Sequence, residues 1–434
     1  MIARSDLLQH MAHPCRITAT TLEARLTDVS IGEVCHIYRS ATDRTLVARA
    51  QVMVFNNDLT ILSLIGSPQG LTREMVICPT GQPFTLLLSD ALRGAVVLPD
   101  GSVSETFSGI ATPGAAQRRD VESPPPGYQE RKGIDARFST GVRAIDSMLP
   151  CGVGQRIGIF SAAGCGKTTL MHMLLENADA DICVVALVGE RGREVTEFID
   201  AVRSSPQRNK CTIVYASSDF CATDRVNAAH VAMTIAEYFR DRGLKVLLFL
   251  DSVTRYARAL RDVALSAGQL PARRGFPASV FARLPELLER PGATQKGSIT
   301  AFFTVLLETE DEADPVAEEV RSILDGHIYL SRKLARKNHY PAIDVLNSVS
   351  RVATRVASGE HQALATRLRD LLARLEELDT LIMFGEYRPG ENPENDRLFA
   401  CKARVSEFLR QAHDEQTSEE TLLRDMKEIV NSAP

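Results

Sequence analysis

The sequence predicts an α/β protein in which helices cover a central parallel sheet, with a small all-β domain before this core and a helical domain after it. Three observations predict this order. β-Branched residues and turns dominate residues 15–110, apolar runs alternate with helix-length segments from 135 to 355, and regularly spaced leucines follow Ser358. A chain of 434 residues is long enough for two or three domains.

The first domain, residues 1–110, consists of short strand-like runs joined by turns. The clearest runs are Gly32–Tyr38, Leu46–Phe55 and Leu59–Ile65, with a turn at Asn56–Asp58 between the last two. A linker over residues 111–134 follows, because three consecutive prolines from Pro124 stand among polar residues.

The core, residues 135–357, alternates buried-strand patterns with helix-length segments, which is typical of a parallel sheet with helices on both faces. The predicted strands cover residues 157–160, 182–188, 212–216, 246–250 and 299–306.

A glycine-rich turn that starts at Ser161 and ends in Lys167 and Thr168 lies between a strand-like run and a helix-like run. A phosphate-binding loop requires this context. Backbone N–H groups from Gly164 onward would converge on phosphate oxygens, Lys167 would reach the β- and γ-phosphates, and the Thr168 hydroxyl would ligate Mg²⁺. Ser161 departs from the GxxxxGKS/T pattern, which begins with glycine, and serine tolerates this position more easily than a bulky residue.

Two carboxylates follow predicted strands. Asp251 ends the run that starts at Lys245, where a Mg²⁺ shell opposite the phosphate loop needs a carboxylate; the alternative is a cap of the next turn. Glu190 follows the strand at 182–188, where a carboxylate can orient and polarise the attacking water; the alternative is a salt-bridged surface group.

Three further residues are candidates for the nucleotide site. Tyr340 can stack on a purine ring, and Arg351 can neutralise charge on a γ-phosphate, although a solvated ion pair is the default for a lone arginine. Spacing alone does not decide whether Arg351 acts in its own site or a neighbour's. Cys165 is either a thiolate favoured by the helix N-terminus or a small buried residue. The predicted nucleotide-binding set is Gly164, Cys165, Gly166, Lys167, Thr168, Thr169 and Tyr340.

The last domain, residues 358–434, is predicted to be helical. Its leucines at 364, 368, 371, 375 and 378 form a ladder that either binds a partner as a coiled coil or packs within its own domain, and the short ladder favours the second. Thr417 and Glu420 form a capping box that opens another helix.

Composition limits the function classes. The net charge of −5 and pI near 6.0 give no general attraction to nucleic acid or anionic lipid. Nine cysteines without CxxC spacing argue against a disulfide framework or a structural zinc site and favour a reducing cytoplasm. The longest apolar runs are too short to span a bilayer, so we expect a soluble protein, at most peripheral to a membrane.

Five motifs in order resemble the type III secretion ATPases, which are relatives of the rotary ATP synthase catalytic subunit. The motifs are Ser161–Thr168, Gly189–Val195, Leu248–Ala257, Pro271–Val280 and Pro341–Ser350. The amino-acid sequence of the phosphate loop is more similar to that of the virulence injectisome branch than to that of the flagellar branch. The resemblance implies a RecA-like P-loop ATPase core, an N-terminal β-barrel oligomerisation domain and a C-terminal helical domain.

The resemblance also implies roles for individual residues. Lys167 and Thr168 would bind phosphate and Mg²⁺, and Asp251 would hold the Mg²⁺ shell. Glu190 would activate water, Tyr340 would line the adenine pocket, and Arg351 would be an arginine finger that acts on the neighbouring subunit's nucleotide. The implied catalytic residues are Glu190, Lys167 and Arg351.

The implied assembly is a homohexameric ring that hydrolyses ATP with Mg²⁺ to release chaperones and unfold secreted substrates. The implied partners are chaperone–effector complexes, stator and stalk proteins and an export gate, with a cytoplasmic location at the inner membrane and no nucleic acid.

Three alternatives remain. A rotary synthase catalytic subunit would need a homologous subunit to supply the finger. A Rho-like RNA translocase would need aromatic and basic residues in its first domain for base stacking, and residues 15–110 contain few aromatics. A nucleotide-sensing scaffold without turnover is disfavoured, because Glu190, Asp251 and Arg351 are all present.

Overall fold

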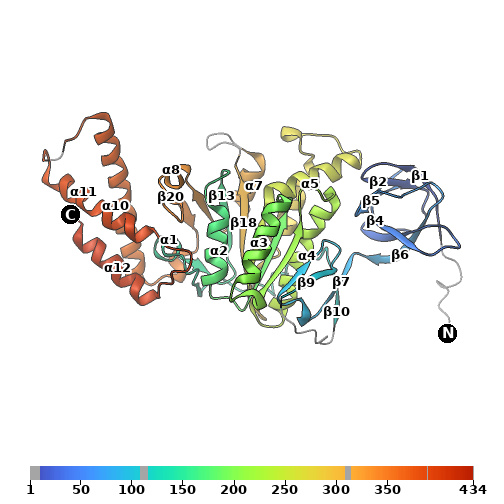
Figure 1. The fold of residues 1–434 in the computed structure, drawn as a ribbon, viewed down its shortest axis with the longest axis horizontal. Coiled ribbons are helices and arrows are strands. Elements are labelled where there is room, and N and C mark those ends of the chain that lie inside the picture. Colours follow the sequence, from blue (N-terminus) through green and yellow to red (C-terminus); the bar gives the residue numbers. More distant parts are fainter. Residues whose placement is uncertain (1–9, 108–115, 308–313, 389, 434) are drawn as a thin grey trace. The chain divides into compact units, whose positions relative to one another are not determined.

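The computed structural model describes residues 10–107, 116–307, 314–388 and 390–433 (Figure 1). Residues 1–9 and 108–115, which belong to the predicted first domain and linker, lie outside the described residues. The chain divides into two compact units. The first comprises Met1–Pro125, Val184–Tyr238 and Leu250–Arg290, and the second comprises Pro126–Cys183, Phe239–Phe249 and Pro291–Pro434.

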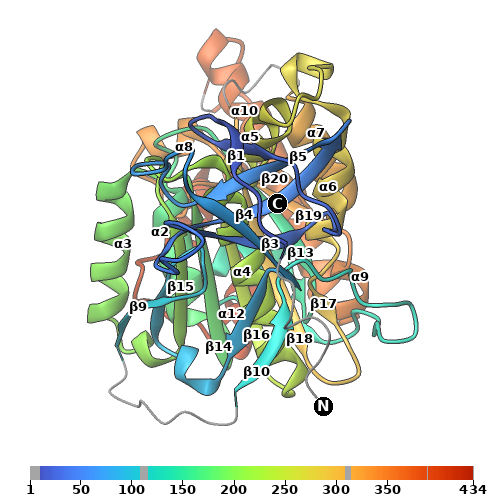
Figure 2. The same ribbon diagram turned by 90° about the vertical axis from the view of Figure 1, so that its right-hand side faces the viewer.

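Six antiparallel strands in the order β1-β2-β5-β4-β3-β6 open the first unit (Figure 2). They are β1 Pro14–Ile17, β2 Thr21–Ala24, β3 Glu33–Tyr38, β4 Leu46–Asn56, β5 Leu59–Ile65 and β6 Val76–Pro83. A bridge between Ala12, just before β1, and Ile77 of β6 joins the two edges, so the sheet closes into a small barrel. Leu22, Val52 and Leu62 are among the side chains that fill it.

Two further strand groups belong to the first unit. β7 (Thr85–Leu88) pairs antiparallel with β10 (Gln117–Asp120), while β8 (Ala95–Val97) pairs parallel with β15 (Cys211–Ala216) and antiparallel with β9 (Val103–Thr106). β10 lies inside the stretch predicted as a linker, because the proline-rich signal begins only after this strand. The domain boundaries stay a prediction.

Among the residues that the structure describes, four α-helices and three short 3₁₀ turns complete the first unit. The helices are α3 Gly192–Ser204, α4 Ala222–Asp241, whose last residues fall in the second unit, α5 Val253–Ser266 and α6 Ala278–Leu288. The turns are η2 Asp90–Leu92, η3 Arg208–Lys210 and η4 Arg273–Gly275. α3 is amphipathic and buries Val195, Phe198 and Val202, spaced three and four residues apart.

The second unit contains a sheet in the order β20-β19-β13-β18, with β17 added to β18. The strands are β13 Arg156–Ser161, β17 Gly292–Ala293, β18 Ser298–Leu306, β19 Gly326–Leu330 and β20 Ile343–Ser350. β13 is parallel to both neighbours, but β20 is antiparallel to β19. The predicted parallel sheet is therefore confirmed for β13 and its two neighbours, and the antiparallel strand β20 makes the sheet mixed. The only helix between β19 and β20, α8 (Arg332–Arg336), spans roughly 8 Å and cannot carry the chain back along the strand.

All five predicted core strands exist. Two of them, β14 (Ile182–Val188) and β16 (Lys245–Asp251), have residues in both units, and the strands β19 and β20 were not predicted. The remaining elements of the second unit are β11 Arg137–Phe138, β12 Cys151–Gly152, α1 Arg143–Met148, α2 Lys167–Asn177, α7 Pro315–Ile323, α9 Ala353–Val356, α10 Gly359–Phe384, α11 Pro393–Leu409 and α12 Glu419–Ser432.

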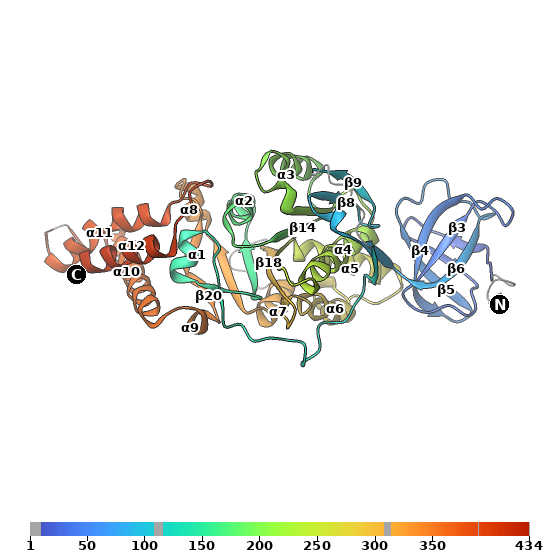
Figure 3. The same ribbon diagram turned by 90° about the horizontal axis from the view of Figure 1, so that it is seen from below.

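The leucine ladder lies on α10, and all five of its leucines are buried. α10 contacts α11, α12 and α1, so the ladder packs within its own unit (Figure 3). The short length of the ladder favours this interpretation over a coiled coil with a partner. The predicted capping box is wrong by one residue. The N-cap of α12 is Ser418, whose Oγ accepts a hydrogen bond from the Thr421 N–H at 3.2 Å, because its extended backbone aims the hydroxyl at the first turn.

No helix within the described ranges is long and apolar enough to cross a membrane. All nine cysteines are free thiols.

Candidate active site

The phosphate-binding loop leaves the sheet after Ser161, the last residue of β13, and enters α2 at Lys167. Gly166 caps the helix with a left-handed backbone (φ +83°). A Cβ atom on Gly166 would lie 2.7 Å from Cε1 of Tyr340, so only glycine fits here. The loop and the tyrosine predicted to line the base pocket are therefore in direct contact.

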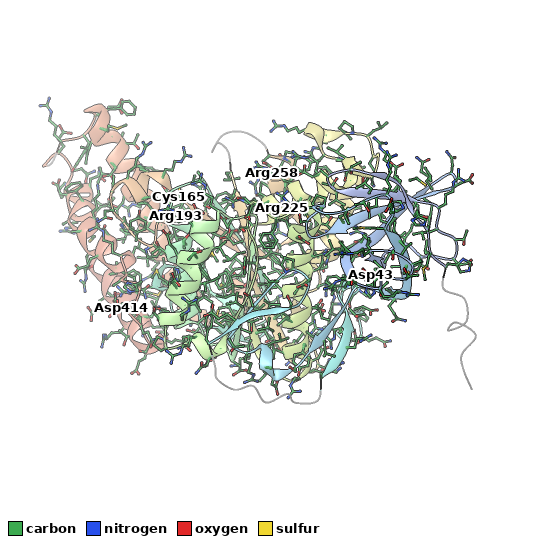
Figure 4. The ribbon with its side chains drawn as sticks, turned by 45° about the vertical axis from the view of Figure 1, so that its right-hand side comes forward. Asp43, Cys165, Arg193, Arg225, Arg258 and Asp414 are labelled. Carbon is green, nitrogen blue, oxygen red and sulfur yellow. The ribbon has the colours of Figure 1, made fainter. Side chains whose placement is uncertain are left out.

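The residues of this loop differ in exposure. Gly164, Thr168 and Thr169 are exposed and Lys167 is half-buried, so these groups are accessible to a ligand. Cys165, labelled in Figure 4, is only 1% exposed, which favours its interpretation as a small buried residue over a reactive thiolate. The Ser161 hydroxyl, where the pattern usually has glycine, is buried and has no hydrogen-bond partner within the described part of the chain.

β20 separates two of the predicted site residues. Its first residue, Ile343, pairs with Leu330 at the carboxyl end of β19, the end from which the phosphate loop leaves β13, and Tyr340 lies at this end. Its last residue, Ser350, pairs with Gly326, which pairs with Ile157 at the start of β13. Eight strand residues span roughly 26 Å, so Arg351 is far from its own phosphate loop.

Arg351 is exposed and anchored at this opposite end of the strand. Its N–H donates to the Asp325 carbonyl at 2.9 Å, and Nη2 lies 3.4 Å from the Arg321 carbonyl oxygen. Burial, together with the charges of Arg321 and Arg351, lowers the pKa of His327. The structure thus brings Tyr340 to the phosphate loop and does not bring Arg351 there.

In the first unit, Glu190 follows the end of β14. The whole residue is 4% exposed, and its Oε2 lies 2.7 Å from Nη1 of Arg255 on α5. The backbone supports this position, because the Ser218 N–H donates to the Glu190 carbonyl at 2.8 Å. A Cβ atom on Gly189 would lie 3.3 Å from the Arg255 side chain, so glycine lets the arginine approach. Glu190 is a buried carboxylate with a fixed orientation rather than a surface group.

Asp251 ends β16 and is 3% exposed. The next residue, Ser252, is the N-cap of α5 and accepts a hydrogen bond from the Arg255 N–H at 3.3 Å. The cap is therefore Ser252 and not Asp251, which removes the structural alternative for this aspartate.

Arg255 is the residue beside this candidate site that the sequence analysis did not single out. It is the third residue of α5, in a motif that the sequence displays, but only the tertiary structure aims its guanidinium at Glu190.

The fold and these residues define a P-loop nucleotide hydrolase. The family model of the ATP synthase alpha/beta family, nucleotide-binding domain, matches residues 141–350, and that of the T3SS EscN ATPase C-terminal domain matches residues 357–428. The chain belongs to the type III secretion system ATPases and hydrolyses ATP.

Several relatives span nearly the whole chain. The SPI-1 type 3 secretion system ATPase of Salmonella typhi is 54% identical and covers 98% of each chain. The type 3 secretion system ATPase of Xanthomonas euvesicatoria is 44% identical, over 96% of this chain and 93% of that protein. The flagellum-specific ATP synthase of Treponema pallidum is 39% identical, over 96% and 92%. The predicted resemblance is confirmed.

The assembled ATPase EscN from enteropathogenic E. coli has a similar structure, with a TM-score of 0.88 at 42% identity, over 96% of this chain and 100% of EscN. A second structure, of EscN in complex with its central stalk EscO, gives a TM-score of 0.86 at the same identity and coverage.

Proposed function

We propose that this ATPase works as a homohexameric ring in which each site takes its water-activating carboxylate from one subunit and its arginine finger from the next. The observation that carries the proposal is the position of Arg351, which is exposed and lies at the opposite end of the sheet from its own phosphate loop. A finger must touch the γ-phosphate, so Arg351 has to serve a neighbouring copy.

The geometry of each remaining residue supports the role that we propose for it. The N–H groups of the loop from Gly164 to Thr169 hold phosphate oxygens at the start of α2, and Lys167 adds a charge-assisted contact. Tyr340 lines the base pocket beside Gly166. Glu190, held by Arg255, orients the water and accepts its proton.

Mg²⁺ fits the chemistry of the predicted ligands. Among the described residues no cluster of three or more His, Cys, Asp or Glu side chains forms a ready-made metal site. The Thr168 hydroxyl and the Asp251 carboxylate are oxygen donors, which Mg²⁺ prefers when it binds together with substrate phosphates. The bound ion would neutralise charge on the transferring phosphoryl group.

We further propose that hydrolysis releases chaperones from chaperone–effector complexes and partly unfolds their cargo for an export gate. EscN has been solved with its central stalk EscO, which supports a stalk partner for this chain, and family membership supports a stator and a peripheral position at the cytoplasmic face of the inner membrane.

The test is complementation between two inactive variants. Rings of pure Glu190→Gln and of pure Arg351→Ala should both be nearly inactive, since a finger is worth about 10³- to 10⁵-fold in rate. In mixed rings, an Arg351→Ala subunit supplies Glu190 and its Glu190→Gln neighbour supplies Arg351, so a measurable fraction of activity should return.

The matched control is Arg355→Ala, which changes another exposed arginine one turn later in the chain and should stay active by itself. Mass measurement verifies that the two variants have mixed. Verified mixed rings with no more hydrolysis than the pure variants would refute finger action in trans.

A further inference from the structure

The loop at residues 410–418, between α11 and α12, meets the nucleotide-binding elements of the second unit at two places; Asp414, labelled in Figure 4, marks this loop. At the first, the amide of Asn177, the last residue of α2, donates to the His413 carbonyl and accepts from Gln416, both at 3.2 Å. At the second, the Gln411 N–H donates to the Tyr340 carbonyl at 3.0 Å. The loop thus contacts the phosphate-loop helix and the base-lining tyrosine separately.

Gln411 is the buried centre of the second contact. It is 6% exposed, and its Oε1 accepts a hydrogen bond from the Arg143 N–H at 2.7 Å. Its Nε2 donates to the carbonyl oxygens of Gly141 at 2.8 Å and Glu415 at 2.7 Å. Both amide hydrogens and the amide oxygen have partners, so the side chain has a single orientation.

The segment that holds Gln411 is itself rigid. The buried Asp146 carboxylate accepts hydrogen bonds from the N–H groups of Thr140 at 3.0 Å and Gly141 at 2.8 Å. The Arg143 guanidinium pairs with the Glu415 carboxylate and donates to the Phe408 carbonyl at 3.1 Å. These contacts fix the segment at residues 140–146, to which the Gln411 side chain is hydrogen-bonded while its N–H contacts the Tyr340 backbone.

We infer that Gln411 is a positioning residue that keeps the Tyr340 ring against Gly166 and so sets the affinity for the adenine base. The inference rests on the proposed role of Tyr340. Because α2 is joined to the loop through Asn177 and not through Gln411, the effect falls on base recognition and leaves phosphate binding unchanged.

The experiment compares the affinities of the full chain for ATP and for inorganic tripolyphosphate, which lacks the base. Gln411→Met keeps the length of the side chain but leaves the Arg143 N–H and two carbonyl groups without this partner. ATP affinity should fall about tenfold, tripolyphosphate affinity should stay within about twofold, and kcat at saturation should be kept. Gln416→Met, a matched change in the same loop, should leave the ratio of the two affinities unchanged.

Gln411→Glu tests the same contact without removing polarity. The ionised carboxylate would face two carbonyl oxygens, whereas the protonated acid can donate to one of them, so its ATP affinity relative to the parent protein should recover as pH falls. This variant also decides the matter if Gln411→Met does not fold. Absence of that recovery, or an equal loss of ATP and tripolyphosphate affinity in Gln411→Met, would overturn the inference.

Tyr340→Ala separates this inference from the proposed function. If Tyr340 lines the base pocket, Tyr340→Ala weakens ATP binding relative to tripolyphosphate, and adding Gln411→Met to it weakens ATP no further. An unchanged ratio in Tyr340→Ala alone rejects the role of Tyr340. If Tyr340→Ala weakens ATP binding relative to tripolyphosphate and the double variant weakens it further, by as much as Gln411→Met does alone, then Gln411 is not the positioning residue of Tyr340.

Discussion

Replacing Arg255 with methionine tests the ion pair that sequence reasoning missed. The Glu190 side chain is 6% exposed and the Arg255 side chain is 24% exposed, so the burial of this ion pair is intermediate. A surface ion pair is worth about 0–1 kcal/mol, whereas breaking a fully buried ion pair costs about 3–5 kcal/mol. We expect Arg255→Met to lower the free energy of unfolding by about 2–3 kcal/mol. With a urea slope of about 3 kcal/mol per M, the unfolding midpoint should fall by roughly 0.7–1 M.

The assay is urea unfolding of the full chain, followed by circular dichroism, with steady-state ATP hydrolysis in parallel. Turnover should drop about 10²-fold, because Glu190 is no longer held in one orientation. Arg191→Met is the matched control, since Arg191 is 77% exposed and lies 3.5 Å from Glu194, and it should change stability by less than about 0.5 kcal/mol.

A double-mutant cycle isolates the pair. Glu190→Gln removes the charge that Arg255 faces, so the double variant Glu190→Gln/Arg255→Met should lose less stability than the sum of the single losses. Additive losses, or an Arg255→Met midpoint within about 0.2 M of the parent value, would refute the assignment.

Three other predictions follow from single residues. Gly166→Ala should abolish measurable ATP binding in a calorimetric titration, because its Cβ would lie 2.7 Å from Tyr340 at a φ of +83°; ordinary affinity would contradict the loop geometry. Arg290→Met should lower the free energy of unfolding by about 3–5 kcal/mol, because the Arg290 side chain is 1% exposed and lies 2.7 Å from the buried Glu237 carboxylate. Adding Glu237→Gln should restore part of this free energy, as measured by urea unfolding. Burial and the charge of Arg290 lower the pKa of His230 well below 6.5 in the folded protein, so below pH 6.5 the unfolded chain binds one more proton than the folded chain. The free energy of unfolding should therefore fall as the pH drops below 6.5, by up to about 1.4 kcal/mol per pH unit. His230→Gln should reduce this slope between about pH 6.5 and 5.5.

The sequence alone determined the elements whose defining pattern lies within one short stretch of residues. The apolar runs predicted the core strands, because a strand buried on both faces must be apolar along its length. The turn from Ser161 to Thr168 predicted the phosphate loop, because its glycines and its Lys-Thr end meet the needs of a triphosphate within a few residues. The leucine ladder predicted α10 by its helical period. The predicted N-cap of α12, Thr417, is wrong by one position, because the cap is Ser418.

The tertiary structure decided what depends on pairing between distant segments. No local pattern states that β20 runs antiparallel to β19, yet this direction places Tyr340 beside the phosphate loop and Arg351 at the far end of the sheet. Likewise, Arg255 reaches Glu190 and the Gln411 N–H reaches the Tyr340 carbonyl only because packing brings together residues that are 65 and 71 positions apart in the chain. Periodicity reports the environment along one element, whereas register and packing between elements decide which side chains meet.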